Sequence, residues 1–342
     1  MQIIESRADL QAWSEGVRAA GQRIALVPTM GALHVGHLSL VEEARKHADR
    51  VVVSIFVNPT QFNDPTDFEG YPREREADLA ACREAGVDVV WMPTAEELYP
   101  PGAATWVEVQ GLSEPLCGSS RPGHFRGVTT VVTKLFLAVR PHVAIFGEKD
   151  FQQLAVIRRM TADLGFGIEI LGGPTVREAD GLALSSRNVR LGPRAREEAL
   201  RIVASLDRAE SLVAAGERDR GTILDAVRGE LARACGARVD YAELRHPETL
   251  ETAPALLTGP TLLAIAVDFE ADPDGQGAAV RLIDNRVLHP GRAGASESPD
   301  PRPERTAVSG PTHETRMKHS ATGHPGPRID ADVRNPEEIP PC

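Results

Sequence analysis

The chain has 342 residues, of which 42% are hydrophobic and 25% charged, and its formal net charge at pH 7 is −11. These values are ordinary for a folded soluble protein with about two domains. An acidic chain argues against a nucleic-acid partner or an anionic membrane surface, because both require a clustered basic face. We therefore expect small-molecule partners.

The N-terminal segment and the cysteines indicate a cytoplasmic location. Glu5 and Arg7 bring charge too early for a signal peptide, and no apolar run approaches the roughly 20 residues that span a bilayer. The cysteines at 82, 117, 235 and 342 form no CxxC pair and no zinc-type cluster with histidine. Reduced structural thiols are the expected reading.

The first half of the chain has the pattern of a parallel α/β sheet. Short apolar runs at 24–27, 51–57, 87–91, 143–146 and 168–171 are predicted strands. Helical patterns between them, at 38–44 and 154–160 for example, are typical of βαβ units. We predict a Rossmann-like, doubly wound domain over residues 1–174.

The pattern of predicted secondary structure changes after Gly172. Two helices rich in Ala, Arg and Glu are predicted near 193–215 and 218–234, followed by strands at 239–244, 262–269 and 278–283. We predict a small α+β domain over 175–290, with a hinge between 172 and 175.

The segment 291–342 contains no Phe, Trp or Tyr, so we predict a disordered tail. The alternative is a metal-binding tail that uses His313, His319 and His324, but their spacing is irregular.

The clearest motif is PTMGALHVGHLSLV, at 28–41, directly after the first of these strands. Gly31 and Gly36 permit close backbone approach, and His34 and His37 are three residues apart, so they share one face of the following helix. A helix N-terminus favours an anion, and we expect the triphosphate of ATP there. One or both imidazoles would donate hydrogen bonds or a proton to the charge on the α-phosphate. A chance pair or a zinc pair is the alternative, which the strand, glycines and helix disfavour.

A second motif, DGLALSSRN, occupies 180–188, just after the predicted hinge. Ser185 and Ser186 supply hydroxyl donors and Arg187 supplies a charged fork suited to phosphate oxygens. A loop at a domain junction can also close over the nucleotide and exclude water. A simple turn or helix cap is the alternative.

A third motif, FGEKDFQQL at 146–154, lies at the carboxyl edge of the predicted sheet, where open α/β folds bind ligands. Lys149 can neutralise phosphate charge, and Gln153 follows one helical turn later. Glu148 and Asp150 are equally compatible with helix capping.

A fourth motif, VNPTQF at 57–62, again follows a strand. Asn58 and Gln61 offer neutral donors and acceptors, which suit hydroxyl and carboxylate recognition. A plain turn is the competing reading.

These motifs in this order, with YPRE from Tyr71, RPGHFRGV from Arg121 and PTVREADGLALSSRN from Pro174, resemble the pantothenate synthetase (pantoate–β-alanine ligase) family from about Met1 to Pro290. That family belongs to the HxGH nucleotidyltransferases, which share this motif with class I aminoacyl-tRNA synthetases. The resemblance implies ATP-dependent condensation of (R)-pantoate with β-alanine through a pantoyl-adenylate, giving pantothenate, AMP and diphosphate. It also implies Mg²⁺ on ATP, no tightly bound organic cofactor, and a homodimer formed through the N-terminal domains.

The resemblance assigns roles by motif position. His37 is the implied proton donor, and the implied catalytic set adds His34, Lys149, Ser185, Ser186 and Arg187. Gln61 and Gln153 would bind pantoate, with Gln61 also near β-alanine, while Asn58 and Arg121 would support substrate binding and His124 is equally compatible with a structural role. The implied ATP contacts are Met30, Gly31, Ala32, Leu33, His34, Val35, Gly36, His37, Gly147, Glu148, Lys149, Asp150, Val176, Leu184, Ser185, Ser186 and Arg187.

Two departures from the family pattern matter. Leu184 stands where methionine is common, a nearly isosteric exchange. An acidic pair is reduced to Asp78, preceded by Ala77, so the protein ligands of Mg²⁺ stay unassigned. Three alternative functions remain. A nucleotide adenylyltransferase would need more basic residues at its acceptor site, and a tRNA synthetase would need a basic RNA-binding domain. The third is a non-catalytic nucleotide-binding module.

Overall fold

The computed structural model describes residues 1–63 and 65–291. The predicted tail beyond Gly291 and the alternative metal site at His313, His319 and His324 therefore lie outside the described residues. The first sheet is parallel throughout, in the order β1-β4-β3-β2-β5-β6. Its strands are β1 (Gln2–Ile4), β2 (Ile24–Thr29), β3 (Arg50–Ile55), β4 (Val89–Trp91), β5 (Val143–Gly147) and β6 (Glu169–Gly173).

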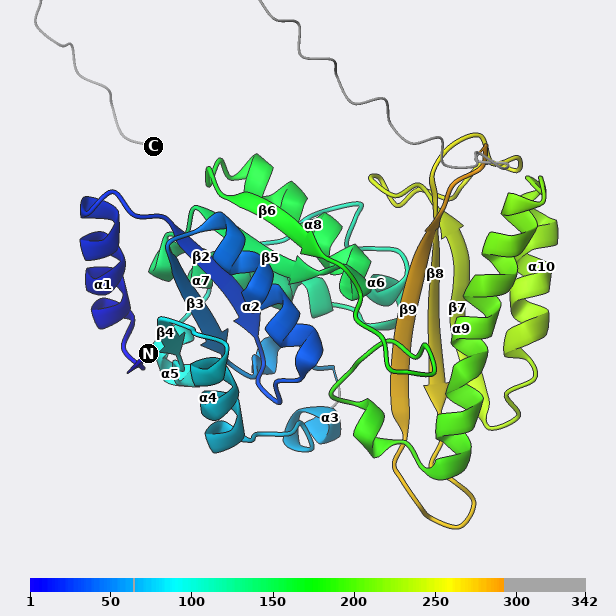
Figure 1. The fold of residues 1–342 in the computed structure, drawn as a ribbon, viewed down its shortest axis with the longest axis horizontal. Coiled ribbons are helices and arrows are strands. Elements are labelled where there is room, and N and C mark those ends of the chain that lie inside the picture. Colours follow the sequence, from blue (N-terminus) through cyan, green and yellow to red (C-terminus); the bar gives the residue numbers. More distant parts are fainter. Residues whose placement is uncertain (64, 292–342) are drawn as a thin grey trace, which may run out of the picture. The chain divides into compact units, whose positions relative to one another are not determined.

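Helices cover both faces of this sheet (Figure 1). Along β2, Ile24 and Leu26 pack with α1 (Arg7–Ala19), α7 (His124–Val139) and α8 (Phe151–Asp163). Ala25 and Val27 point the other way and pack with α2 (Val35–His47) and α4 (Arg75–Glu84). Burial on both faces explains why these strands read as continuous apolar runs.

Short helical turns occupy the connections that matter for the site. They are η1 (Pro59–Gln61), α3 (Pro65–Glu69), α5 (Ala95–Leu98), α6 (Cys117–Ser120), η2 (Glu148–Asp150) and η3 (Asn188–Arg190).

The order of the strands places a switch point between β2 and β5. The chain runs from β2 to β3 on one side, whereas β5 pairs with β2 on the other. In open α/β sheets a crevice forms at the carboxyl ends of such neighbours. The HxGH segment follows β2 and the GEKD segment follows β5, so the two motifs meet at this crevice.

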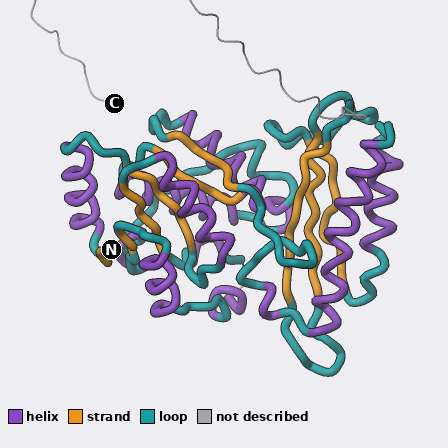
Figure 2. The backbone as a smooth tube through the Cα atoms, viewed as in Figure 1, coloured by secondary structure: helices purple, strands orange, loops and turns teal. Residues whose placement is uncertain are grey.

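A second sheet is antiparallel, in the order β7-β8-β9, and Figure 2 shows its strands as a separate group. Its strands are β7 (Ala237–Arg245), β8 (Thr261–Phe269) and β9 (Val280–Leu288). One face packs against α9 (Pro193–Ala214) and α10 (Arg220–Leu231). Leu262 and Ala264 belong to a separate cluster with Leu116, against which Phe151 of α8 packs.

The fold class is confirmed: a parallel sheet flanked by helices is followed by a small antiparallel sheet with two helices. The sequence missed the edge strand β1, which is only three residues long. The last strand was predicted to end at 283, but it continues to Leu288. Asp284, Asn285 and Arg286 break the apolar alternation that revealed its first half.

The described residues form one compact unit, so the division into two domains at 174/175 stays a prediction. Within them Cys82, Cys117 and Cys235 are free thiols. None of the helices in the part of the chain that the structure describes has the length and apolar character needed to cross a membrane.

Candidate active site

The loop that joins β2 to α2 has left-handed backbone at Gly31 and at Ala32, whose φ is +49°. Gly31 has a φ of +85°, and a Cβ there would lie 2.9 Å from an Asp78 oxygen. The Asp78 carboxylate accepts the backbone N–H groups of Ala32 at 3.0 Å and Leu33 at 2.7 Å. Burial nevertheless raises the pKa of Asp78 above its ordinary value. Asp78 therefore shapes this loop, and its carboxylate oxygens are already used.

The two histidines open helix α2 but do not share its face. His34 is the N-cap with extended backbone, and its Nδ1 accepts the N–H of Gly36 at 3.2 Å. The His37 Nδ1 accepts the N–H of His34 at 3.4 Å, and the ring centroids are 4.1 Å apart. The expectation of a shared helical face is thus corrected: the helix begins at Val35, and the rings meet because each caps the helix start.

The electrostatic setting keeps both imidazoles neutral. Burial, reinforced by His34 and Lys149 and partly opposed by Asp150, lowers the pKa of His37 to about 3. Burial and Lys149 also lower the pKa of His34. Since each Nδ1 accepts an N–H, the proton of each neutral ring resides on Nε2. The pair offers hydrogen-bond donors at neutral pH.

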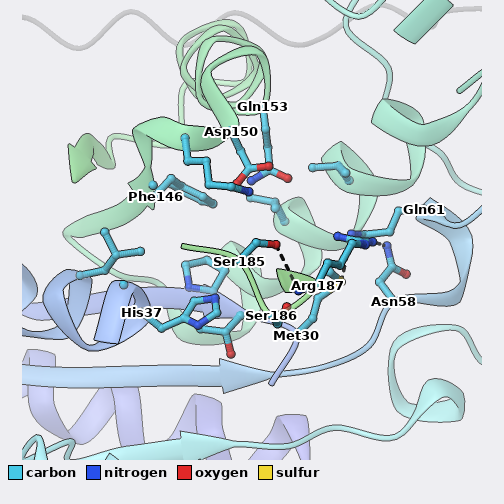
Figure 3. Close-up of a pocket in the computed structure, with 18 of the residues that line it drawn as sticks. Met30, His37, Asn58, Gln61, Phe146, Asp150, Gln153, Ser185, Ser186 and Arg187 are labelled. Atoms are coloured by element: carbon cyan, nitrogen blue, oxygen red, sulfur yellow. Dashed lines mark hydrogen bonds between the residues drawn. The ribbon is translucent and has the colours of Figure 1, made fainter. Parts of the chain in front are cut away.

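Two adjoining cavities open beside these residues, with volumes of about 240 and 700 Å³. The smaller, here called the first cavity, lies at the ends of β2, β3 and β5, and Figure 3 shows the side chains gathered around it. The larger, the second cavity, is lined partly by β7, β8 and β9. The residues common to both are Arg121, His124, Lys149, Asp150, Gln153, Ser185 and Arg187.

The SSRN loop reaches the first cavity with its serines and its arginine. The Ser185 Oγ accepts the N–H of Arg187 at 3.2 Å, and Ser186 Oγ lies 3.5 Å from the Tyr71 hydroxyl. Arg187 donates to Asp67 at 3.1 Å, so α3 and this loop are joined across the site. Sequence reasoning assigned no role to Asp67 or Tyr71, although Tyr71 stood in a quoted string.

Neutral amide side chains line another part of the first cavity. Asn58 is 1% exposed and donates to the Gln61 Oε1 at 3.0 Å, while its own oxygen accepts the Tyr99 hydroxyl at 2.9 Å. Asn58 therefore orients Gln61, because its side chain is already engaged with protein partners. Gln61 also approaches the Met30 sulfur at 3.1 Å, and Gln153 reaches the same cavity from α8.

Arg121 and His124 support this region from the segment before α7 and its first turn. Arg121 donates to the Gln61 carbonyl at 3.2 Å, and His124 Nδ1 lies 2.7 Å from the same oxygen. Burial, with Arg121 nearby, lowers the pKa of His124 to about 4. A neutral His124 must donate through Nδ1 to that carbonyl, which makes it a satisfied structural group.

Most residues expected at the site line one or both cavities. They are Met30, His34, Gly36, His37, Asn58, Gln61, Arg121, Gly147, Lys149, Asp150, Gln153, Val176, Leu184, Ser185, Ser186 and Arg187. Five expected residues do not line either cavity: Gly31, Ala32, Leu33, Val35 and Glu148. Val35 is 58% exposed. The Glu148 carboxylate lies against Gly172, where a Cβ would be 2.8 Å from it. For Asp150, the capping reading fails because its side chain makes no cap hydrogen bond to α8.

Comparison with known proteins decides what this site belongs to. The Pantoate-beta-alanine ligase family matches residues 2–287. The pantothenate synthetase of Desulfatibacillum aliphaticivorans is 53% identical over 290 residues, covering 85% of this chain and 100% of the relative. The chain belongs to the pantoate–β-alanine ligase family. The pantothenate synthetase of Geobacter sulfurreducens is 54% identical over 288 residues, covering 84% of this chain and 99% of the relative.

Solved pantoate–β-alanine ligases have the same fold. The pantothenate synthetase of Thermus thermophilus superposes with a TM-score of 0.77 at 44% identity, covering 85% of this chain and all of that chain. The Francisella tularensis ligase, solved with beta-gamma ATP and beta-alanine, gives a TM-score of 0.67 at 33% identity. The match covers 84% of this chain and 97% of that chain. The resemblance in sequence is therefore confirmed, and this member of the ligase family is an enzyme that forms pantothenate from pantoate and β-alanine with ATP.

Proposed function

We propose that the first cavity holds ATP and pantoate together and that pantoyl-adenylate forms there. The observation that supports this proposal is that one cavity is lined by two chemically distinct groups of side chains. Lys149, Arg187 and the serines suit a polyphosphate, whereas Gln61 and Gln153 suit a hydroxy acid. The apolar side chains of Val176 and Leu184 then border the adenosine.

In the first step a carboxylate oxygen of pantoate attacks the α-phosphorus, and the bond from that phosphorus to the bridging oxygen breaks. Diphosphate leaves with its negative charge, which Lys149 and Arg187 offset. The Nε2–H groups of His34 and His37 donate to the α-phosphate oxygens as charge builds on them. The resemblance gives His37 the role of proton donor, and before nucleotide binds burial lowers its pKa to about 3 and keeps the ring neutral, so its Nε2–H is the group that meets the α-phosphate.

Pantoate is oriented by amides without added charge. Gln61 and Gln153 hydrogen-bond its hydroxyl and carboxylate groups, and Asn58 fixes the amide of Gln61. A cationic side chain in their place would pair with the pantoate carboxylate and weaken it as a nucleophile. The amides hold the acid while leaving an oxygen free to attack.

The second substrate approaches from the second cavity. Arg187, Arg190, Arg238 and Arg281, which line it, each pair with an aspartate. Within the described residues Arg121 has no such partner, so it attracts the β-alanine carboxylate. The β-alanine amine attacks the acyl carbon, the carbon–oxygen bond to phosphate breaks, AMP leaves and the amine loses a proton.

Mg²⁺ fits this cavity as a companion of the triphosphate. Asp150 is the carboxylate that lines the first cavity among the described residues, and within residues 1–63 and 65–291 no cluster of three or more metal-ligating side chains exists. Mg²⁺ commonly combines one or two carboxylates with substrate phosphates. Asp150 would hold the ion, which neutralises phosphate charge when it is bound.

We further propose a homodimer that works in the cytoplasm. The dimer is supported by the family resemblance, and the location by the acidic chain with free thiols at Cys82, Cys117 and Cys235. Sedimentation equilibrium of the purified chain tests the dimer, which requires twice the mass of one chain.

The decisive experiment measures diphosphate release from ATP and Mg²⁺. With pantoate alone we expect a burst stoichiometric with enzyme, because the adenylate stays bound, and with added β-alanine we expect steady turnover. His37→Ala should slow the burst by about 10²- to 10³-fold, the usual loss when one donor to developing charge is removed.

His47→Ala is the matched control, since His47 lies in the last turn of the same helix and pairs with Glu43. It should leave both rates unchanged. Release that does not depend on pantoate would contradict the proposed chemistry, and an unimpaired His37→Ala would remove that residue from it.

A further inference from the structure

We propose that Asp284 and Asn285, adjacent residues of strand β9, are positioning residues of the ligase reaction. Each holds one of the two segments that supply the proposed nucleotide site, so together they set the spacing of that site. This inference rests on the nucleotide site proposed above. Neither residue belongs to any motif that the sequence analysis identified.

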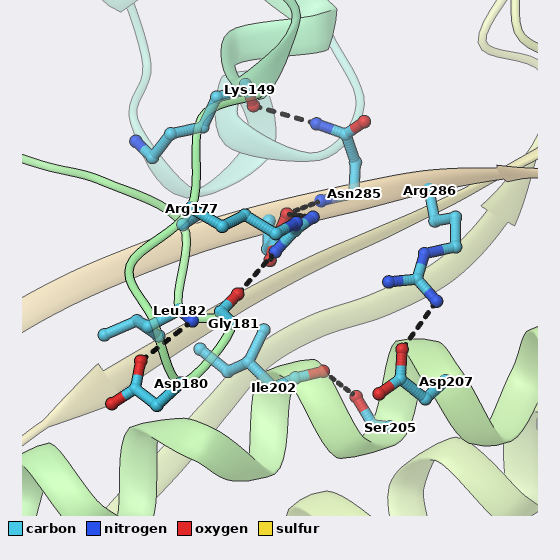
Figure 4. A network of polar contacts seen from close by, with 12 residues as sticks. Lys149, Arg177, Asp180, Gly181, Leu182, Ile202, Ser205, Asp207, Asn285 and Arg286 are labelled. Atoms are coloured by element: carbon cyan, nitrogen blue, oxygen red, sulfur yellow. Dashed lines mark hydrogen bonds and ion pairs between the residues drawn. The ribbon is translucent and has the colours of Figure 1, made fainter. Parts of the chain in front are cut away.

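Asn285 fixes the main chain that follows β5. Its Nδ2 donates to the carbonyl oxygen of Glu148 at 3.0 Å. It also donates to that of Lys149 at 2.9 Å (Figure 4). A side-chain amide nitrogen has two hydrogens, and both are used here. The Lys149 side chain, which lines both cavities, therefore starts from an immobilised backbone.

Asp284 fixes a hairpin at residues 176–184, whose two arms pair at Arg177 and Ala183 and which leads into the SSRN loop. Its side chain is 2% exposed, and its two oxygens accept from Arg177 at 2.7 and 3.0 Å. Arg177 also donates to the Gly181 carbonyl at 3.0 Å, inside the turn of the hairpin (Figure 4). At the end of the hairpin the N–H of Leu184 donates to the Val176 carbonyl at 2.9 Å. Ser185 follows immediately.

Stability alone does not account for this buried ion pair. Replacing such a pair by apolar side chains of similar volume is often neutral or stabilising, because both charges must lose water. Removing one partner is costly, since it leaves a buried charge unpaired. The pair does, however, define one geometry for the hairpin, as a bidentate contact constrains direction as well as distance.

Strand geometry explains why two adjacent residues can hold two different segments. Successive side chains of a strand leave opposite faces. Asp284 shares a face with Leu282, which packs with α9 and α10, and Asn285 shares a face with Ile283, which packs against the core of the first sheet. Strand β9 is itself paired with β8 along its full length. One rigid strand thereby sets the separation of Lys149 from the SSRN loop.

The first test is Asn285→Ala with steady-state kinetics. We expect the KM for ATP to rise about tenfold or more, because slightly misplaced binding groups lose much of their interaction. The KM for β-alanine should stay within about twofold, a split that general destabilisation would not produce. Arg286→Ala is the matched control, since Arg286 is the next residue on β9 and pairs with Asp207 and Glu210 of α9. Its kinetics should match the parent.

The second test separates positioning from stability with the double variant Arg177→Met, Asp284→Leu. We expect a melting temperature near the parent value together with a raised KM for ATP. A parental KM for ATP in both this variant and Asn285→Ala would overturn the inference.

Lys149→Met and Ser185→Ala, measured in parallel, test the underlying nucleotide site. If they leave the KM for ATP unchanged, the proposed site itself is wrong. If they raise it while neither Asn285→Ala nor the double variant does, only the positioning role fails.

Discussion

The imidazoles of His34 and His37 are uncharged at neutral pH, and this determines what they can offer to a phosphate. Their Nδ1 atoms accept backbone N–H groups at the start of α2, which fixes the proton on Nε2. A histidine spacing read from sequence gives neither the tautomer nor the protonation state. The tautomer depends on the backbone N–H groups at the start of α2. The protonation state depends on burial and on Lys149 of η2, which lies more than a hundred residues later in the chain.

A pH dependence of stability follows from His37. Its pKa is lowered from 6.5 to about 3 in the folded protein, so below pH 6.5 the unfolded chain binds more protons. Protonation of this ring in the unfolded chain therefore leaves the free energy of unfolding at its full value above pH 6.5 and lowers it as the pH falls toward 3. The free energy of unfolding, measured by chemical denaturation, should fall less steeply between pH 6.5 and 5.5 in His37→Gln than in the parent. The expected difference is up to about 1.4 kcal/mol per pH unit. Identical slopes would contradict the neutral, buried state of this ring.

At the scale of elements, the packing of α7 against η1 sets the position of Gln61. Gly127 of α7 lies so close to η1 that a Cβ would be 2.3 Å from the Thr60 oxygen and 2.8 Å from the Gln61 nitrogen. The Asn58 amide also donates to the Gly127 carbonyl at 3.2 Å. The backbone of Gln61 is therefore placed by close contact between two elements that are distant in sequence.

Gly127→Ala should displace η1, since a Cβ cannot occupy that space. We expect a stability loss of about 1–3 kcal/mol and a kcat/KM for pantoate at least about tenfold lower. Gly229→Ala is the control, because nothing lies within 4 Å of a Cβ at this position of α10. That change should stabilise by roughly 0.5–1 kcal/mol with unchanged kinetics. Equal effects from the two substitutions would refute the close packing of α7 on η1.

The predicted elements that were correct are those with a local signal. The runs at 24–27 and 143–146 are apolar because both faces of the sheet are covered, and the glycines and histidines after β2 mark a turn into a helix. What the sequence did not reveal depends on long-range pairing. Asp284 and Asn285 lie beyond the predicted end of the last strand at 283, and only the fold brings them to Arg177 and to the carbonyl of Lys149.

At the scale of the whole molecule, the family match ends at residue 287 while the chain continues to Cys342. The described cavities use no residue beyond Asn285. A chain that lacks Gly291–Cys342 should therefore retain parental turnover with all three substrates. A large loss of activity in the truncated chain would assign the tail a role in the reaction.

The contacts of Asn285 are made to main-chain oxygens and not to the side chains of residues 148 and 149. The support of the site is consequently independent of which side chains those positions carry. The charge at position 149 can be removed or reversed while the scaffold around it persists, so substitutions there report on chemistry and not on architecture. The same separation would let this position vary over evolutionary time without loss of the fold.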